Sequence, residues 1–305
     1  MLTVFLFIMN SNIAAFQDYL QKEKKYSQHT VKAYCGDVLE FQVFNTAEFD
    51  DDDIAGVAYG QIRSWIVLLV DGGLSNTSVN RKIASLKAFY RFLLKSKQIV
   101  VSPLVKHKAL KTNKILQIPF SEKEIVNALN VEIGSGSFEI VRNKLIVDLF
   151  YATGMRRAEL IGLRYANVDL SNSTIKVLGK RSKERILPIL PVVMGQFSRY
   201  IEERSHLELI SDEDSFFLSK KGLKLSDSFV YRLINSYFSR VSEKVKTSPH
   251  VLRHTFATHL LNNGADLNSV KELLGHSSLA STQIYTHSSL LELKKVYNEA
   301  HPRSE

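Results

Sequence analysis

Along the first third of the chain, apolar residues recur at intervals of three and four, which is the spacing of amphipathic helices. Ile13, Phe16 and Leu20 form the first such run, and further runs begin at Val31 and Val79. Another apolar run lies between them, at residues 62–70. The pattern predicts four or five short helices and no strand.

Polar and glycine-rich stretches separate these runs. Ser27 or Thr30 is placed to cap the second predicted helix. The acidic stretch 49–53 is expected to be a solvated loop, and the sequence DGG at 71–73 is a helix stop signal. Residues 10–100 are therefore predicted to form a small helical bundle, the first of two domains.

Residues 101–119 have a different composition. They contain two prolines and four lysines with weak periodicity, which is typical of an extended, basic linker between domains. Such a linker is suited to lie along a phosphate backbone. Ser121, followed three residues later by Glu124, forms a capping-box pattern that predicts the first helix of a second domain, 120–305.

The second domain is predicted to be mostly helical with a small sheet. Between residues 167 and 190 the pattern changes to alternation, interrupted by the turn sequences SNS and GKRSKE. These two hairpin turns predict three short antiparallel strands. Helical periodicity covers residues 142–151, 157–163, 194–204, 229–241, 252–263 and 267–274. The predicted fold class is mainly α, in two domains, with a small three-stranded antiparallel sheet in the second.

Composition narrows the possible partners and compartment. Lysine and arginine number 40 against 31 aspartates and glutamates, a net charge of +9 that favours polyanionic partners. Cys35 is the only cysteine, so an intramolecular disulfide and four-cysteine metal sites are excluded, and a reducing cytoplasm is expected. The apolar start of the chain is nine residues long, too short for a membrane span, and Met1 and Met9 are both candidate start residues.

Two short segments contain candidate chemistry, and each has a plain structural alternative. Arg156 follows Gly154 between two predicted helices and suits an anion site; an ion pair with Glu159 is the alternative. His250 and Arg253 are three residues apart at a helix start that Pro249 favours, an arrangement suited to a phosphate. Capping and surface roles are their alternatives.

Three further residues complete the candidate set. Lys180 lies at a hairpin turn, where it is either a solvated turn residue or a mobile proton donor. His276 follows Gly275, a predicted helix end, and Tyr285 lies among small polar residues. A cap for the helix and an aromatic anchor for the tail are their structural alternatives.

Taken in order, these six residues and their phrases resemble the tyrosine site-specific recombinases of the phage integrase family. The matching phrases are ATGMRRAEL, GKRSKER, HVLRHTFAT, LLGH and TQIYTH. The resemblance runs from about residue 12 to the end and is strongest to the Xer recombinases. It implies a SAM-like, core-binding domain at residues 10–100 and a catalytic domain at 120–305.

The resemblance also implies a mechanism. Tyr285 would attack a DNA phosphodiester to give a 3′-phosphotyrosyl linkage, while Arg156, Arg253 and His276 bind the phosphate oxygens. His250 would accept the tyrosine proton, and Lys180 would protonate the leaving 5′-oxygen. No metal or other cofactor is expected.

Partners follow from the same resemblance. The expected substrate is double-stranded DNA with a palindromic core site. It would be bound by a homo-tetramer, or by a hetero-tetramer with a second recombinase. A DNA translocase is the expected activator. The tail helix carrying Leu290, Leu291, Leu293 and Val296 is expected to dock into a neighbouring protomer, with packing on its own domain as the alternative.

Candidate DNA contacts lie mainly on the helix that begins at Val79. Its basic residues give it a charged outer side, with an ordinary solvated face as the alternative. The full candidate set is Thr30, Arg81, Lys82, Lys87 and Arg181. Resolution of chromosome or plasmid dimers is the favoured role, with the integrase of a mobile element and a non-catalytic DNA-binding protein of the same fold as alternatives.

Overall fold

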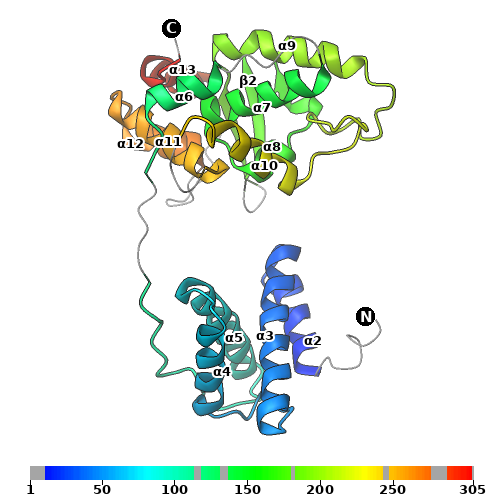
Figure 1. The fold of residues 1–305 in the computed structure, drawn as a ribbon, viewed down its shortest axis with the longest axis vertical. Helices are drawn as coiled ribbons and strands as arrows, with labels where there is room; N and C mark the ends of the chain where they lie inside the picture. Colours follow the sequence, from blue (N-terminus) through cyan, green and yellow to red (C-terminus); the bar gives the residue numbers. More distant parts are fainter. Residues whose placement is uncertain are drawn as a thin grey trace. The chain divides into compact units, whose positions relative to one another are not determined.

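The computed structural model forms two compact units, Met1–Ile115 and Leu116–Glu305 (Figure 1). It describes residues 11–112, 118–130, 137–179, 183–242, 247–275 and 287–303, and no side chains for 287–292. Each unit has its own apolar core. None of the helices within these ranges has the length and apolar character needed to cross a membrane.

The first unit is the predicted helical bundle. Its helices are α2 (Ser11–Asp18), which continues into a π-helical turn (Tyr19–Glu23), α3 (Gln28–Phe49), α4 (Tyr59–Asp71) and α5 (Asn76–Lys95). Of the two candidate caps for the second predicted helix, Ser27 takes the role: its hydroxyl accepts a hydrogen bond from the Thr30 backbone at 3.2 Å. The apolar positions that defined the four runs form the core of this unit.

The beginning of the predicted linker packs on the first unit. Leu104 is buried in that core. The side-chain amide of Asn80 on α5 donates to the Leu110 carbonyl and accepts from the Leu110 N–H, both at 2.9 Å. Asn76 adds a bond to the Lys111 carbonyl at 2.8 Å. The described part of this segment, 101–112, is therefore a strap along α5.

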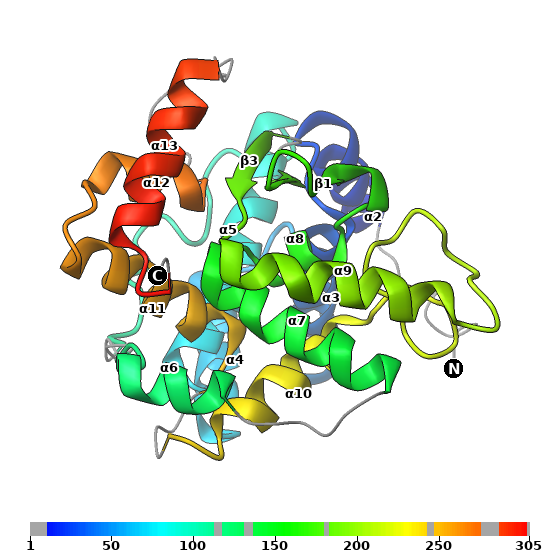
Figure 2. The same ribbon diagram turned by 90° about the horizontal axis from the view of Figure 1, so that it is seen from above.

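The second unit is built around one buried helix. α7 (Phe138–Thr153) is buried on all sides from Leu145 to its end, with α9 (Pro191–Ser205) and α11 (Pro249–Asn262) packed against it (Figure 2). A helix that is apolar all round belongs in the middle of a domain. The remaining helices are α6 (Glu122–Leu129), α8 (Arg157–Ile161), α10 (Asp227–Phe238), α12 (Leu267–Leu274) and α13 (His287–Ala300).

Two local predictions for this unit are confirmed. The capping box at the start of α6 is present, with the Glu124 carboxylate accepting from the Ser121 N–H at 2.7 Å. The three strands form an antiparallel sheet in the order β1 (Val168–Asp169), β2 (Thr174–Leu178) and β3 (Glu184–Pro188). Alternation along β3 turns Arg185 and Leu187 to the buried side of the sheet.

The tail helix α13 packs on its own domain, the alternative that the sequence left open. Leu293, Tyr297 and Ala300 are buried in the core of the second unit. The Tyr297 hydroxyl donates to the Ala152 carbonyl at the end of α7, and Arg303 donates to Asp148 at 2.7 Å. Docking of this helix into a neighbouring protomer stays a prediction.

Candidate active site

The end of α7 and the start of α8 form a tight turn that fixes Arg156. Gly154 terminates α7 in the left-handed region, with a φ of 58°. A Cβ atom at this position would lie 2.3 Å from Cδ1 of Phe256, so both the backbone and the packing require glycine. Arg156 is the residue just before α8, and its backbone N–H donates to Glu159 Oε2 at 2.7 Å.

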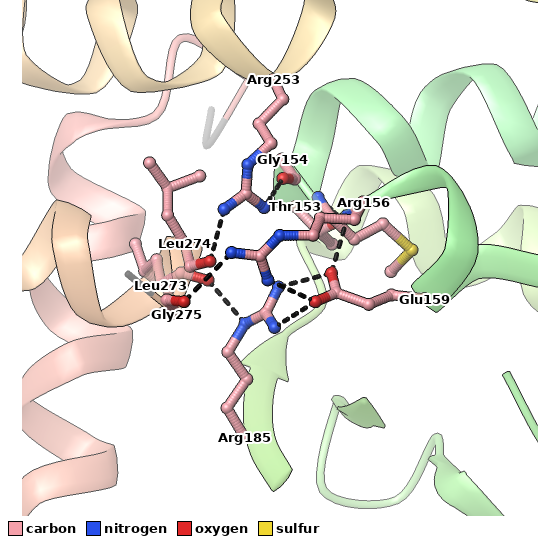
Figure 3. Close-up of polar contacts among 10 residues, drawn as sticks. Thr153, Gly154, Arg156, Glu159, Arg185, Arg253, Leu273, Leu274 and Gly275 are labelled. Atoms are coloured by element: carbon pink, nitrogen blue, oxygen red, sulfur yellow. Dashed lines mark hydrogen bonds and ion pairs between the residues drawn. The ribbon is translucent and has the colours of Figure 1, made fainter. Parts of the chain in front are cut away.

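Arg253 reaches the same turn from α11. Arg253 is 9% exposed. Its Nη1 donates to the Gly154 carbonyl at 2.7 Å, and its Nη2 donates to the Leu274 carbonyl. Burial lowers the pKa of Arg253 to about 10, and the neighbouring positive charge of Arg156 acts in the same direction. The guanidinium groups of Arg156 and Arg253 therefore lie next to each other, with the Gly154 carbonyl beside that of Arg253 (Figure 3).

A third arginine, Arg185 of β3, joins this pair through a shared carboxylate. Arg185 Nη1 and Nη2 donate to Oε1 and Oε2 of Glu159 at 2.7 and 2.8 Å. Arg156 Nη1 donates to the same Oε1, also at 2.7 Å. Burial raises the pKa of Glu159, but the hydrogen bonds and charges of Arg185 and Arg156 outweigh it, and the pKa is lowered.

The C-terminal end of α12 faces all three arginines. The carbonyls of Leu273, Leu274 and Gly275 accept from Arg185, Arg253 and Arg156, in that order (Figure 3). These are carbonyls that a helix end leaves without intrahelical partners, and they bear the negative end of its dipole. Gly275 ends α12 in the left-handed region with a φ of 62°, as the sequence predicted.

Comparisons with known proteins identify the family of the chain. A family model described as "Phage integrase family" matches residues 126–291, and one described as "Phage integrase, N-terminal SAM-like domain" matches residues 13–97. The chain belongs to the phage integrase family. The resemblance drawn from the sequence is confirmed.

Curated relatives match over nearly the whole chain. The tyrosine recombinase XerC of Anoxybacillus flavithermus is 37% identical over 304 residues, which cover 97% of this chain and 99% of the relative. XerC of Staphylococcus epidermidis is 36% identical, over 93% of this chain and 95% of the relative. The chain is a Xer-like tyrosine recombinase, an enzyme that breaks and rejoins DNA.

A solved structure supports the fold. The XerH site-specific recombinase, bound to its palindromic difH substrate in a post-cleavage complex, superposes with a TM-score of 0.71 at 22% identity. The match covers 93% of this chain and 83% of the other. At that identity the likeness shows the fold, a helical domain followed by an α-rich domain with a small sheet.

The structure brings together some of the six candidate residues of this recombinase. Arg156 and Arg253 converge, and His250 is exposed at the second position of α11, one turn before Arg253. Lys180, His276 and Tyr285 lie outside the described residues.

Gly179 and Gly275, which precede Lys180 and His276 in the sequence, both lie close to the arginine cluster. An added Cβ on Gly179, just before Lys180, would lie 3.7 Å from both Arg185 Nη1 and Glu159 Oε1. An added Cβ on Gly275 would lie 3.1 Å from the Arg185 side chain. Gly179 and Gly275 therefore border the arginine cluster, and in the sequence they are the residues that precede Lys180 and His276.

The candidate DNA contacts of the first unit are in varied surroundings. Lys82 is buried and its amine is bound to Asp37, at 3.3 Å, and to Glu40, which corrects its expected place on an exposed basic face. Arg81 is bidentate to Asp37 at 2.6 and 2.9 Å, but half of its side chain is exposed.

The other candidate DNA contacts make fewer hydrogen bonds within the protein. Thr30 shares a hydrogen bond with Ser27, and Lys87 donates to the carbonyl of His107 on the strap at 3.5 Å. Arg181 lies outside the described residues. Of the candidates on α5, Arg81 is exposed and Lys87 is partly exposed, and the basic residues Arg91 and Lys95 of the same helix are exposed as well.

Sequence reasoning missed Arg185 and gave Glu159 only a structural part. The predicted pair of Arg156 with Glu159 exists, at 2.7 Å, and it coexists with the arginine cluster. A signal for Arg185 was present, since alternation along β3 puts a charged residue at a core-facing position. Among the described residues, no three His, Cys, Asp or Glu side chains are grouped closely enough to hold a metal ion.

Proposed function

We propose that this recombinase cleaves DNA with Tyr285 as nucleophile and that Arg156 and Arg253 hold the scissile phosphate. The observation that supports this most is the convergence of the two guanidinium groups at the Gly154 turn. Each guanidinium has five N–H donors, and its hydrogen bonds to backbone carbonyls and, for Arg156, to Glu159 use two of them. The remaining donors are suited to non-bridging phosphate oxygens.

The reaction exchanges one ester for another. The phenol oxygen of Tyr285 bonds to phosphorus as the bond from phosphorus to the 5′-oxygen breaks. His250, on the exposed first turn of α11, accepts the phenol proton, and Lys180 donates a proton to the departing 5′-oxygen. Attack by a 5′-hydroxyl from another duplex reverses these steps and exchanges strands. His276 adds a further donor to the phosphate oxygens.

Positive charge is concentrated where the reaction builds negative charge. The pentacoordinate transition state carries more charge on its non-bridging oxygens than the phosphodiester does, so preorganised guanidinium groups bind it more strongly than the substrate. Burial of Arg253 strengthens this effect because a less polar surrounding screens the charge less.

The substrate class and assembly follow from the Xer resemblance. We expect a palindromic core site, in keeping with the palindromic substrate of the XerH complex. A tetramer of one or two recombinases acts on two such sites, with a DNA translocase as activator, to resolve chromosome or plasmid dimers. Residues 13–97 form the core-binding domain, and Arg81 and Lys87 of α5 contact the DNA.

A suicide substrate tests the nucleophile. Candidate palindromic core sites are nicked near the cleavage point, so that the released fragment diffuses away, and are incubated with the protein in a chelating buffer. We expect a covalent protein–DNA band that survives boiling in detergent. Tyr285→Phe should bind the same DNA with unchanged affinity and give no such band.

Two results would contradict the proposal. A covalent band of normal intensity in Tyr285→Phe would assign the attack to another residue. Tight, specific binding by the wild-type protein without any covalent product, even with a second recombinase added, would favour the non-catalytic DNA-binding alternative.

A further inference from the structure

Arg185 is placed where DNA cannot reach it. Its side chain is 6% exposed, on the buried side of β3. Three of its N–H donors are used inside the protein, two for Glu159 and one, from Nε, for the Leu273 carbonyl at 2.9 Å. Any effect of Arg185 on DNA cleavage must therefore be indirect, through the groups that it binds.

We propose that Arg185 is a positioning residue for strand cleavage, which neutralises Glu159 and fastens the end of α12 so that Arg156 and Arg253 are directed at the phosphate. The inference rests on the function proposed above for those two arginines. It assigns to Arg185 no contact with DNA.

The first part of the argument concerns the shared carboxylate. Glu159 is 3% exposed at its side chain and ionised, and a buried carboxylate requires a positive partner. Arg185 meets both oxygens in a forked pair, which is the strongest geometry for this contact. Without it, Arg156 would be the remaining guanidinium bound to Glu159, and the carboxylate would hold Arg156 back from a phosphate.

The second part concerns the end of α12. Leu273, Leu274 and Gly275 each accept from a different arginine of the cluster, so the helix end and the arginines fix one another. Arg185 ties this end to β3, a strand of the sheet. Loss of that bond leaves the segment that leads to His276 held by fewer contacts, and a displacement of about 1 Å in a catalytic group costs roughly a hundredfold in rate.

A purely structural role is the competing explanation, because removal of any buried arginine destabilises a domain. Arg204 offers a matched control in the same unit. It is likewise buried, at 9% exposed against 5% for Arg185, and it donates to the backbone carbonyls of Glu213 and Ser215, but it is not part of the arginine cluster. Arg204→Met should lower the melting temperature and leave the positions of Arg156 and Arg253 unchanged.

The experiment compares Arg185→Met, Arg185→Lys and Arg204→Met with the wild-type protein. Three quantities are measured for each: the melting temperature, the Kd for a core-site duplex, and the single-turnover rate of covalent complex formation on the suicide substrate at saturating DNA. The saturating rate separates a positioning effect from a loss of binding.

We expect Arg185→Met to bind the duplex within about threefold of the wild-type Kd and to form the covalent complex roughly a hundredfold more slowly. Arg185→Lys should recover about tenfold of that loss, since it restores a charge beside Glu159 but not the fork. Arg204→Met should keep the wild-type rate within about twofold at a temperature where it remains folded.

A double variant tests the path through the carboxylate. Glu159→Gln removes the charge that Arg185 neutralises, so Glu159→Gln/Arg185→Met should cleave faster than Arg185→Met alone. The inference is overturned if Arg185→Met cleaves as fast as Arg204→Met, if its Kd rises as much as its rate falls, or if the double variant is the slowest. Failure of the wild-type protein to form a covalent complex would count against the proposed function instead.

Discussion

Gly154 lies at the centre of the candidate site, and its replacement by alanine tests how tightly the site is built. Two costs are expected, one from the backbone and one from packing. The φ of 58° at this residue is in the left-handed region, where an L-residue with a Cβ atom is strained. The added Cβ would also lie 2.3 Å from Cδ1 and 2.9 Å from Cε1 of Phe256.

The two costs have different sizes. The left-handed backbone costs alanine about 1–2 kcal/mol. Forcing an extra carbon against a fully packed ring costs about 1–3 kcal/mol. Because Phe256 is 1% exposed and belongs to the core of the second unit, the ring has no free space to enter. The free energy of unfolding of that unit should therefore fall by about 2–5 kcal/mol.

The single tryptophan makes the assay specific to a unit. Trp65 is buried in the first unit, so its fluorescence follows unfolding there, while far-UV circular dichroism follows both units. In urea titrations of a chain with two units, the two signals are analysed separately. Gly154→Ala should shift the part of the dichroism transition that the tryptophan does not report, and leave the fluorescence midpoint in place.

A second substitution separates packing from backbone strain. Phe256→Ala removes all three ring atoms that lie within 3 Å of the new Cβ, so Gly154→Ala in that background should cost only the backbone term, about 1–2 kcal/mol. The coupling energy between the two positions should then be about 1–3 kcal/mol. An equal cost of Gly154→Ala in both backgrounds would refute the packing argument, and a cost below about 1 kcal/mol would refute both.

Two further predictions concern other parts of the chain. Asn80→Ala removes the two bonds between its side-chain amide and Leu110 of the strap 101–112, so trypsin should cut at the lysines of this segment about tenfold faster or more. Asn76→Ala, which removes one exposed bond, should have a smaller effect, and a wild-type cleavage rate in Asn80→Ala would contradict the strap. Burial lowers the pKa of His301 from 6.5 to about 3, so its stabilising effect is complete above pH 6.5 and is lost as the pH falls toward 3. Between pH 6.5 and 5 the second unit should lose about 2 kcal/mol through this group, and His301→Gln, but not a change at the exposed His206, should remove that slope in denaturant titrations.

The helices and strands could be predicted from the sequence because each depends on residues that are close together in the chain. Periods of three and four located α3, α5 and the others, Ser121 with Glu124 marked the start of α6, and two turn sequences set the three strands. Arg156 and Arg253 were found in the same way, each in a distinctive local phrase. Local patterns identify such residues before anything is known of their neighbours.

The errors arise where distant segments meet. Lys82 was placed on an exposed basic face because a helical wheel of α5 alone cannot show Asp37, which comes 45 residues earlier on α3 and binds its amine. The segment 101–119 was expected to be an extended, basic linker, and the packing of its first part on α5 was not foreseen because the bonds are to Asn80, 30 residues away. Arg185 was overlooked for the same reason, since Glu159 and Leu273 come from α8 and α12.

The charges of the arginine cluster explain why a buried ion pair is present at all. Apolar side chains of similar size in place of both Arg185 and Glu159 would often stabilise a fold equally well, so stability alone does not call for this ion pair. Arg156, Arg185, Arg253 and Glu159 together carry three positive charges and one negative charge. With Glu159 balanced by Arg185, the charges of Arg156 and Arg253 remain for the phosphate. A phosphodiester has one negative charge, and attack by a phenolate adds a second in the transition state. Under the proposed function, the cluster therefore matches the charge of the transition state rather than that of the substrate, and loss of Arg185 alone would reverse that preference.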